Sequence, residues 1–381
     1  MKVALLTNIV TPYTHRLFER MGQSLGGDLS VFACSETEPE RHWTVAPARY
    51  YRRAALAGLR LHRSYVSHIY LNPGIVPALL GTRYDVVVLS DFSPTMMMAC
   101  AAARARRIPV IISTDGQPET DPGRHSRIHR LARRAIVPLC AAGVGASRGS
   151  LALLQSYGLA PEASFLSPIA PGWDFVGSPP SFDARPFDLL FCGHLDDDRK
   201  GALFFADVVD GLVARGRRPT VRVAGDGPLR DALAERLRAA GVEARFDGFL
   251  SQETLAEAYA SAKVFLFPSR GDPWGLVANE AIQCGTPVIA SVHAQSSLEL
   301  VGPSGTGRVL PLVVADWTEA TERYLDDRAA WQGAHAAAVA ATRTFSIDAM
   351  TNGFMASFDY VTAGSGGTPS GALGASLGRA E

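Results

Sequence analysis

Short apolar runs alternate with longer amphipathic segments along the whole chain. This rhythm of strand, helix and strand predicts mainly parallel sheets that are covered by helices on both faces. The expected strands of the first half are residues 2–8, 29–34, 85–90, 109–114 and 143–147. Those of the second half are residues 188–193, 220–226, 244–249, 264–269, 286–291 and 307–312. The pattern therefore predicts an α/β protein with two doubly wound domains.

A proline-rich stretch without helical periodicity, residues 167–188, separates the two series of strands. It predicts a first domain over 1–170, a linker over 171–187 and a second domain over 188–345. An amphipathic terminal helix is expected over 346–362, capped by Ser346, and one possible arrangement returns it to the first domain. The tail 363–381 is rich in glycine, serine and alanine, which predicts disorder. Ligands of such folds bind at the carboxyl ends of the strands, so we expect a site between the domains.

Composition agrees with a globular protein of two or three domains, because the 381 residues are 47% hydrophobic and 19% charged. No apolar run is long enough to span a membrane, and the opening MKVALLTNIV lacks a basic leader and a cleavage site. We therefore expect a cytoplasmic protein. The cysteines are far apart without a CxxC pair, which favours buried apolar side chains over a zinc site or disulfides: Cys34, Cys100, Cys140, Cys192 and Cys284.

Charge is balanced overall but uneven along the chain. Residues 1–170 hold 19 basic and 11 acidic side chains, a net +8, and the remainder holds 37 − 19 = 18 against 37 − 11 = 26, a net −8. The basic half predicts an anionic partner, such as a lipid headgroup or a phosphorylated acceptor, or else a solvated basic face. The run 123–135, with 49–53 and 104–107, is a candidate surface for peripheral contact with the inner face of a membrane. We expect no nucleic-acid partner.

Candidate chemistry begins in the stretch GDPWGLVANEAIQCGTPVIA, residues 271–290. It reads as a turn followed by a helix, and Gly275 falls at the helix start, where free N–H groups and the helix dipole favour a phosphate. Asp272 precedes this turn and Glu280 follows it. Carboxylates beside a phosphate suit the hydroxyl groups of a sugar or ribose. The alternative is an acidic loop before a helix with one surface glutamate.

Two further loops follow strands of the second series. The stretch FCGHLDDDRKGALFF, residues 191–205, leaves a strand through Gly193 and reaches Lys200, which is well placed to neutralise a diphosphate. An ordinary exposed lysine is the alternative. The GDGP turn that begins at Gly225 is weaker support, because many glycine-rich turns are only tight connections.

Together, GHLDDDRKG, VAGDGP, FDGFLSQETLAEAYASAKVFLFPS, DPWGLVANEAIQCGTPVIAS and FSIDAMTNGFMASFDY resemble the second domain of glycosyltransferase family 4. These are retaining enzymes with the GT-B fold, two Rossmann-like domains that face each other across a cleft. The resemblance covers about residues 188–362 and is weak over 1–170. It implies a nucleotide-sugar donor, UDP- or GDP-linked, on the second domain and an acceptor on the first.

The resemblance also implies roles for individual residues. Glu280 would hold the ribose hydroxyls, Asp272 a hydroxyl of the transferred sugar, and Lys200 the leaving phosphate. The remaining donor contacts would come from the glycine loops and from backbone amides at the helix start: Gly193, His194, Gly225, Trp274, Gly275 and Leu276. Asp272 stands where the family usually has Glu, and His194 where it has Arg, which points to an unusual donor.

The implied reaction retains the configuration of the sugar and needs no metal. The acceptor attacks on the face that the diphosphate leaves, and a phosphate oxygen takes its proton. Charge on the leaving group would be met by Lys200 and a helix terminus. The acidic run Asp196, Asp197 and Asp198 is expected to be solvated rather than metal-binding.

The first domain offers acceptor-side candidates. Thr11 and His15, with Asn8, follow the first strand, where the family's glycine pair is replaced by TPY. Asp115 follows the strand ending PVIIST, where the family often has a histidine, and is a candidate to touch the sugar or to assist the acceptor hydroxyl. Asp91 is a comparable candidate. The alternatives are a helix-face histidine and simple turn carboxylates.

These observations favour a retaining, hexosyltransferase-type glycosyltransferase that transfers a sugar to a hydroxyl acceptor, anionic or lipid-linked, in polysaccharide or glycolipid assembly. A sugar-nucleotide epimerase of the same fold is one alternative, although the carboxylate, seven-residue, Glu spacing argues against it. A non-catalytic nucleotide-sugar binder is another, because of Asp272 and His194.

Overall fold

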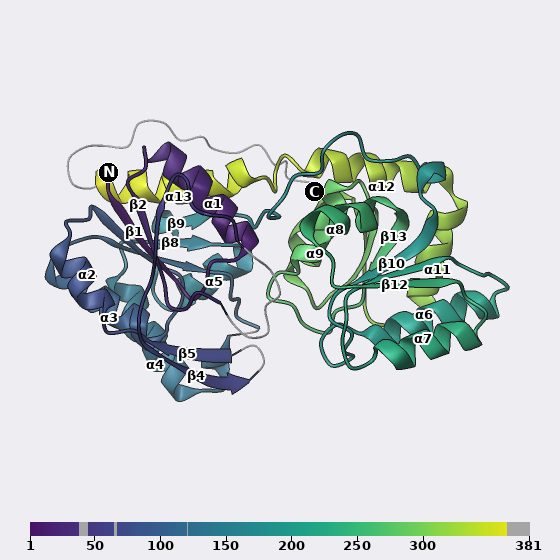
Figure 1. Cartoon of the computed structure of the whole chain (residues 1–381), viewed down its shortest axis with the longest axis horizontal. Helices are drawn as coiled ribbons and strands as arrows, with labels where there is room; N and C mark the ends of the chain where they lie inside the picture. Colours follow the sequence, from purple (N-terminus) through teal and green to yellow (C-terminus); the bar gives the residue numbers. More distant parts are fainter. Residues whose placement is uncertain (38–44, 65–66, 120, 364–381) are drawn as a thin grey trace.

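The computed structural model describes residues 1–37, 45–64, 67–119 and 121–363. The first domain is built on a seven-stranded parallel sheet in the order β3-β2-β1-β6-β7-β8-β9 (Figure 1). Its strands are β1 (Val3–Thr7), β2 (Leu29–Ala33), β3 (Arg52–Ala55), β6 (Val86–Leu89), β7 (Val110–Thr114), β8 (Ala142–Gly145) and β9 (Ser164–Leu166). The central strands are buried on both faces, which explains their continuous apolar sequences.

Helices cover both faces of this sheet. One face packs against α1 (Pro12–Ser24) and α13 (Ile347–Ala363). The other packs mainly against α2 (Ile75–Gly81) and α3 (Pro94–Ala105). The helices α4 (Arg127–Ile136) and α5 (Arg148–Ser156) lie on the connections from β7 to β8 and from β8 to β9. The domain therefore has the doubly wound arrangement that the sequence predicts.

The second domain has a six-stranded parallel sheet in the order β12-β11-β10-β13-β14-β15. Its strands are β10 (Phe187–Cys192), β11 (Val221–Ala224), β12 (Ala244–Gly248), β13 (Ala262–Phe267), β14 (Val288–Ser291) and β15 (Gly307–Leu310). One core contains α6 (Ala202–Ala214), α7 (Arg230–Ala239) and α11 (Val314–Asp326). The opposite core contains α8 (Gln252–Ala260) and α9 (Leu276–Gln283), and α12 (Arg328–Ala341) contributes to both.

Each expected strand is present, but four described strands were not predicted. Strand β3 has the sequence RRAA and every residue is exposed, because it lies at a sheet edge and needs no apolar alternation. Strand β9 has only three residues. The antiparallel hairpin of β4 (Leu59–Ser64) and β5 (Ser67–Leu71) forms a separate two-stranded sheet. The tail after Ala363 lies outside the described residues.

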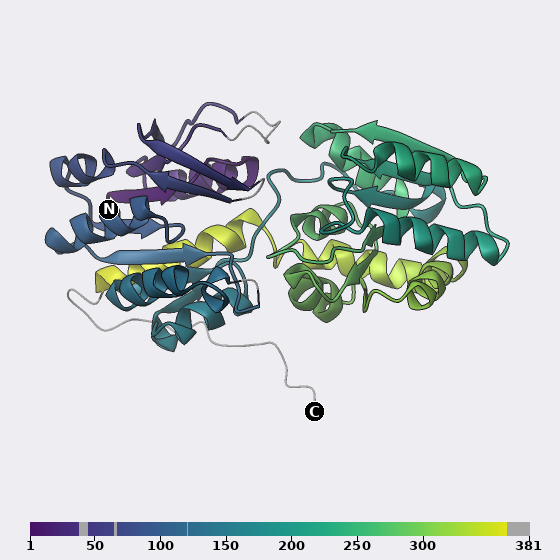
Figure 2. The ribbon, with the colours of Figure 1, turned by 90° about the horizontal axis from the view of Figure 1, so that it is seen from below.

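The last helix, α13, lies within the first domain although it follows the second along the chain (Figure 2). The Ser346 hydroxyl caps it by accepting a hydrogen bond from the Ala349 N–H at 3.2 Å. Its buried side chains Phe354 and Phe358 join the core beneath α1, and Arg20 of α1 pairs with Asp348 at 2.7 Å. No helix among the described residues is both long and apolar enough to cross a bilayer.

The carboxyl edges of the two sheets face each other. Gln117, just after β7, donates from Nε2 to the Pro273 carbonyl, which follows β13, at 3.1 Å. The backbone N–H groups of Arg148 and Gly149, just after β8, donate to the Glu299 carboxylate at 2.9 and 3.1 Å. Residues after the strands of one domain thus contact residues after the strands of the other.

Candidate functional site

The lysine loop and the DPWG turn meet at the carboxyl edge of the second sheet. Lys200 Nζ lies 2.7 Å from Asp272 Oδ2, and both side chains are 13% exposed. The same oxygen accepts a hydrogen bond from the Ser269 hydroxyl at 2.8 Å. Asp272 Oδ1 accepts no hydrogen bond from the described residues, which leaves it for a ligand hydroxyl. His194 lies in the loop between β10 and Lys200, and its carbonyl accepts the Asp196 N–H at 2.9 Å.

A close backbone contact with the lysine loop explains why residue 225 is a glycine. Its φ is +133°, and a Cβ at this position would lie 1.9 Å from the Gly193 carbonyl oxygen. The GDGP turn therefore packs by its backbone against the loop that begins at Gly193. A side chain at Gly225 would displace the start of that loop, which leads to Lys200.

The start of α9 is open toward a ligand. Gly275, its N-cap, has a φ of +92° and no space for a Cβ, which would lie 2.7 Å from Phe267. The backbone N–H groups of Leu276 and Val277 have no acceptor among the described residues. Such orphan donors at a helix start are an anion site.

The Trp274 side chain lies away from solvent and fixes the turn. It is 4% exposed, and its Nε1 donates to Asn279 Oδ1 at 2.7 Å. Asn279 donates in turn to the Ile169 carbonyl at 3.0 Å, which connects the turn to the end of the first domain. Only the backbone of Trp274 is thus placed to meet a ligand. Asn279 has no distinguishing signal in the sequence, because it looks like any polar residue on a helix.

Glu280 is buried on α9, with an exposed fraction of 9%. The Tyr259 hydroxyl of α8 donates to Glu280 Oε2 at 2.9 Å. Burial raises the pKa of Glu280 to about 7, against the lowering effects of the Tyr259 hydrogen bond and the Lys200 charge. The Cys192 thiol at the end of β10 also lies near, and its pKa is raised to about 12, mainly by burial. Glu280 is therefore a buried carboxyl group beside Lys200, which excludes the surface-glutamate alternative.

Of the acidic run, Asp198 is exposed as expected, but Asp196 and Asp197 have local structural roles. Asp196 Oδ1 accepts from the Lys200 N–H at 2.7 Å, and Asp197 Oδ1 accepts from the Leu203 N–H at the start of α6 at 3.0 Å. Asp197 also pairs with Arg270 at 3.0 Å. Among the described residues, no group of three His, Cys, Asp or Glu side chains has an arrangement that could hold a metal ion.

Asp115 lies across the domain boundary from Asp272. It follows β7 and precedes Gln117, whose hydrogen bond to Pro273 sets the Asp115 loop against the Asp272 turn. Its side chain is exposed, but the surrounding protein raises its pKa through desolvation, and the charge of Asp91 adds to the effect. This placement brings a carboxylate of the first domain toward the expected sugar position.

The other acceptor-side candidates have local partners. Thr11 is the N-cap of α1 and forms a capping box with Thr14. His15 Nδ1 lies 2.9 Å from the Tyr51 hydroxyl, and burial lowers the pKa of this imidazole. Asp91 Oδ1 accepts the Ser93 N–H at 2.8 Å, and burial raises its pKa. Local structure therefore accounts for all three, and His15 lines a different cavity from Thr11 and Asp115.

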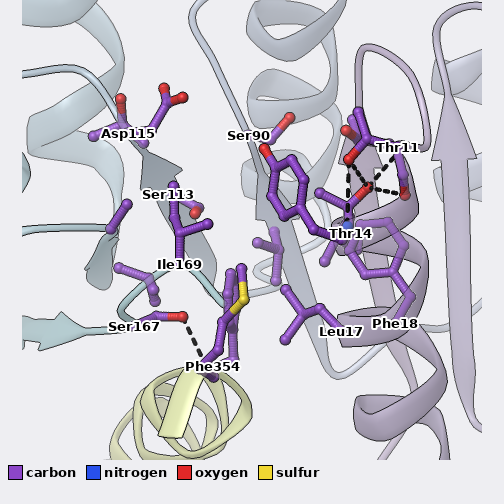
Figure 3. A pocket seen from close by; sticks show the side chains of 18 of the residues that line it. Thr11, Thr14, Leu17, Phe18, Ser90, Ser113, Asp115, Ser167, Ile169 and Phe354 are labelled. Carbon is purple, nitrogen blue, oxygen red and sulfur yellow. Dashed lines mark hydrogen bonds between the residues drawn. The ribbon is translucent and has the colours of Figure 1, made fainter. Parts of the chain in front are cut away.

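A cavity of about 400 Å³ opens beside Asp115, between the carboxyl ends of the first sheet, α1 and α13 (Figure 3). Thr11 and Thr14 lie on one side, Ser113 and Asp115 on the other, and Phe354 of α13 at the far end. Its volume is within the range of roughly 300–1,000 Å³ that is typical of small-molecule sites. The sequence did not predict this cavity, because α13 follows the second domain.

The part of the chain that contains Lys200, Asp272 and Glu280 is similar to a known family. Residues 186–327 match the family model of glycosyl transferases group 1. The chain is 24% identical over 311 residues to a sulfoquinovosyl transferase of Arabidopsis thaliana, which covers 74% of this chain and 57% of that protein. It is 30% identical over 149 residues to an alpha-D-kanosaminyltransferase of Streptomyces kanamyceticus, 38% of each chain. The chain thus matches about half the length of these relatives, or less.

Solved structures resemble the whole chain. Anabaena HepE in complex with UDP and glucose superimposes with a TM-score of 0.69, at 16% identity, over 94% of this chain and 99% of that one. The lipopolysaccharide outer core galactosyltransferase WaaB gives a TM-score of 0.69 at 15% identity, over 96% and 100%. The chain therefore has the two-domain GT-B fold, with a second domain that matches the glycosyl transferases group 1 family.

Proposed function

We propose that this protein is a retaining glycosyltransferase that transfers a sugar from a nucleotide-sugar donor to a hydroxyl acceptor. The observation that carries the proposal is the arrangement of Lys200, Asp272 and Glu280 around the open start of α9. Glu280 binds the ribose hydroxyls, and the N–H groups of Leu276 and Val277 receive the diphosphate. The matched family model covers all of these residues, which supports the assignment.

Lys200 can pair with Asp272 and bind the diphosphate at the same time. An ammonium has three N–H donors, and the pair with Asp272 uses one of them, so two remain for the diphosphate. As the sugar C1–O bond to the phosphate breaks, Lys200 and the α9 amides stabilise the charge on the leaving oxygen. The acceptor oxygen bonds to C1 on the same face, and its proton passes to the leaving phosphate. This charge distribution requires no metal ion.

Thermal unfolding with UDP, GDP, dTDP and ADP sugars tests the donor site, because a ligand of the folded state raises the apparent Tm. We expect one nucleotide class to shift the Tm. Glu280→Ala should weaken this ligand about tenfold or more, since the ribose loses its carboxylate. Lys200→Ala should lower kcat about 100-fold, with a smaller effect on donor binding.

Lys263→Ala is the matched control, because Lys263 also pairs with an aspartate, Asp188, at 2.7 Å, but at the start of β13 rather than at the site. Wild-type affinity and rate in both site variants would refute the assignment. Conversion of the donor without an acceptor would instead favour an epimerase. Binding without any turnover would favour a non-catalytic nucleotide-sugar binder.

We propose further that the enzyme works in the cytoplasm and attaches to anionic membranes through α4. The exposed face of this helix contains Arg127, Ile128, Leu131 and Arg134, with Ile128 80% and Leu131 69% exposed. Two large apolar side chains between arginines suit insertion at a lipid headgroup layer. The exposed basic surface is smaller than the sequence predicted, because Arg133 is buried and pairs with Asp121 at 2.6 Å.

Co-sedimentation with vesicles tests this attachment. We expect binding to vesicles that contain phosphatidylglycerol and about tenfold weaker binding by Ile128→Ser/Leu131→Ser, which removes apolar contact but no charge. Val339→Ser, at an exposed apolar position of the second domain, is the control. Equal binding by wild type and the double variant would argue against a role for α4.

A further inference from the structure

The cavity beside Asp115 has a polar end and an apolar end (Figure 3). The polar end includes Ser113 and Asp115, with Ser90 between them and Thr11 and Thr14 of α1. The hydroxyl groups of Ser90 and Ser113 have no hydrogen-bond partner among the described residues. The opposite end is apolar and includes Leu17 and Phe18 of α1 and Phe354 of α13. The cavity can therefore form hydrogen bonds with a ligand at one end and contact it with apolar side chains at the other.

The residues that line the cavity include a negative charge but no positive charge. None of the twenty residues that line it is Lys, Arg or His, and Asp115 is its one carboxylate. An anion placed here would lose its hydration, would meet no positive charge, and would lie beside a negative one. The cavity thus disfavours phosphate or carboxylate groups.

The cavity also lies next to the donor side. The Gln117 hydrogen bond to Pro273, at 3.1 Å, holds the Asp115 loop against the turn between Asp272 and Trp274. A ligand in the cavity can therefore present a hydroxyl group toward the sugar that Asp272 would hold.

We propose that this cavity binds the acceptor, and that the acceptor is a neutral amphiphile. Its hydroxyl groups face Ser90, Ser113 and Asp115, and its apolar part lies between α1 and α13. Asp115 accepts a hydrogen bond from the reacting hydroxyl and orients its oxygen toward C1 of the sugar. This inference rests on the proposed glycosyltransferase function and narrows its acceptor: a phosphorylated acceptor group is excluded from the cavity.

Three matched probes test separately whether binding requires hydroxyl groups and whether it requires an apolar chain. Hexyl β-D-glucoside has hydroxyl groups and an apolar chain, methyl β-D-glucoside has only the hydroxyl groups, and hexyl phosphate has the chain with an anion. Calorimetric titration of the full chain, with UDP present, would measure their affinities. We expect hexyl glucoside to bind at least about tenfold more tightly than either of the others.

Ser90→Phe places a ring in the cavity from a half-buried strand end and should weaken hexyl glucoside about tenfold or more. Ser113→Phe fills the same space from β7 and is the second variant. Ser24→Phe, at an exposed position near the end of α1, is the control. Retained thermal stabilisation by UDP shows that each variant is folded.

The outcomes distinguish this inference from the function on which it rests. Nucleotide binding together with tight hexyl glucoside binding that both cavity variants lose supports it. Nucleotide binding with preference for hexyl phosphate, or with no preference among the probes, overturns it and leaves the donor assignment intact. Hexyl glucoside binding that the cavity variants do not weaken also overturns it. Absence of any nucleotide binding refutes the proposed function itself.

Discussion

The carboxyl group of Glu280 has a pKa of about 7, above its ordinary value of 4.5, because burial disfavours its charge. A raised pKa means that the folded state binds this proton more tightly than the unfolded state does. The resulting stability is fully present below pH 4.5 and is lost as the pH rises through 7. We expect this carboxyl group to lower the free energy of unfolding by about 3 kcal/mol between these limits.

Urea unfolding of the nucleotide-free protein at pH 5 and pH 8 would measure this loss. Glu280→Gln should be less dependent on pH than the wild type, because the amide cannot ionise but can still accept from Tyr259. Glu322→Gln, at a partly exposed ion pair with Arg215, is the control. The same pH dependence in wild type and Glu280→Gln would contradict the raised pKa.

The same ionisation should govern donor affinity. A carboxylate accepts two ribose hydroxyls, whereas a neutral acid must use one oxygen as a donor. We therefore expect nucleotide affinity to rise about tenfold between pH 6 and pH 8, as Glu280 becomes ionised. Titrations of Glu280→Gln would lack this rise, and a rise of equal size in that variant would assign it to another group.

Sequence reasoning selected Lys200 and Asp272 because each lies in a glycine-containing loop after an apolar strand, and Glu280 because it lies in the helix that follows. It did not reach Tyr259 or Ser269, which hold Glu280 and Asp272. Tyr259 lies among apolar residues of α8, where a tyrosine is normally a core residue, and its hydroxyl partner is known only once α8 and α9 are packed together.

At the scale of elements, buried strands were predictable and exposed ones were not. Most predicted strands are buried apolar runs and the predicted edge strands β12 and β15 are partly buried, whereas β3 is exposed and basic. Helix α4 shows a related limit. The spacing of its arginines predicted a largely basic face, but Arg133 turns inward to Asp121. The partner, Asp121, lies 12 positions before Arg133 and outside the helix. The periodicity of α4 therefore cannot predict this ion pair.

The close contact between Gly193 and Gly225 predicts that the GDGP turn and the lysine loop depend on each other for their conformation. Gly225→Ala places a Cβ against the Gly193 carbonyl at a φ of +133°, so the GDGP turn and the lysine loop cannot pack as they do. We expect a loss of about 3 kcal/mol in unfolding free energy and a weaker Tm shift with nucleotide. Gly177→Ala also has a φ that L side chains rarely adopt, +99°, but nothing lies within 4 Å of its Cβ, and the substitution should cost about 1 kcal/mol. Equal losses would show that the loop contact is unimportant.

At the scale of the whole molecule, the sequence predicted two domains and a site between them, but not how the domains meet. Hydrogen bonds that join them involve Gln117, Asn279 and Glu299, of which Glu299 accepts two. Each looks like an ordinary polar residue of a loop or helix. Their partners are backbone groups more than 100 positions away, which have no signature in a sequence.

Glu299 accepts two hydrogen bonds from the first domain, so its removal should weaken the contact between the domains. Its carboxylate accepts the Arg148 and Gly149 N–H groups at the start of α5, where the helix dipole favours a negative charge. Charged hydrogen bonds of this kind contribute about 1.5–3 kcal/mol. Glu299→Ala should therefore lower the population of the closed arrangement about tenfold.

Small-angle scattering and a fluorophore pair across the two domains would detect this opening as a larger radius of gyration and lower energy transfer. Transfer activity should fall, because the loops of Asp115 and Asp272 separate in most molecules. Nucleotide affinity should be preserved, since the residues proposed to bind the nucleotide lie within the second domain. Glu322→Ala, which breaks an ion pair inside the second domain, should change neither property. Unchanged domain separation in Glu299→Ala would mean that the remaining contacts suffice to hold the two sheet edges together.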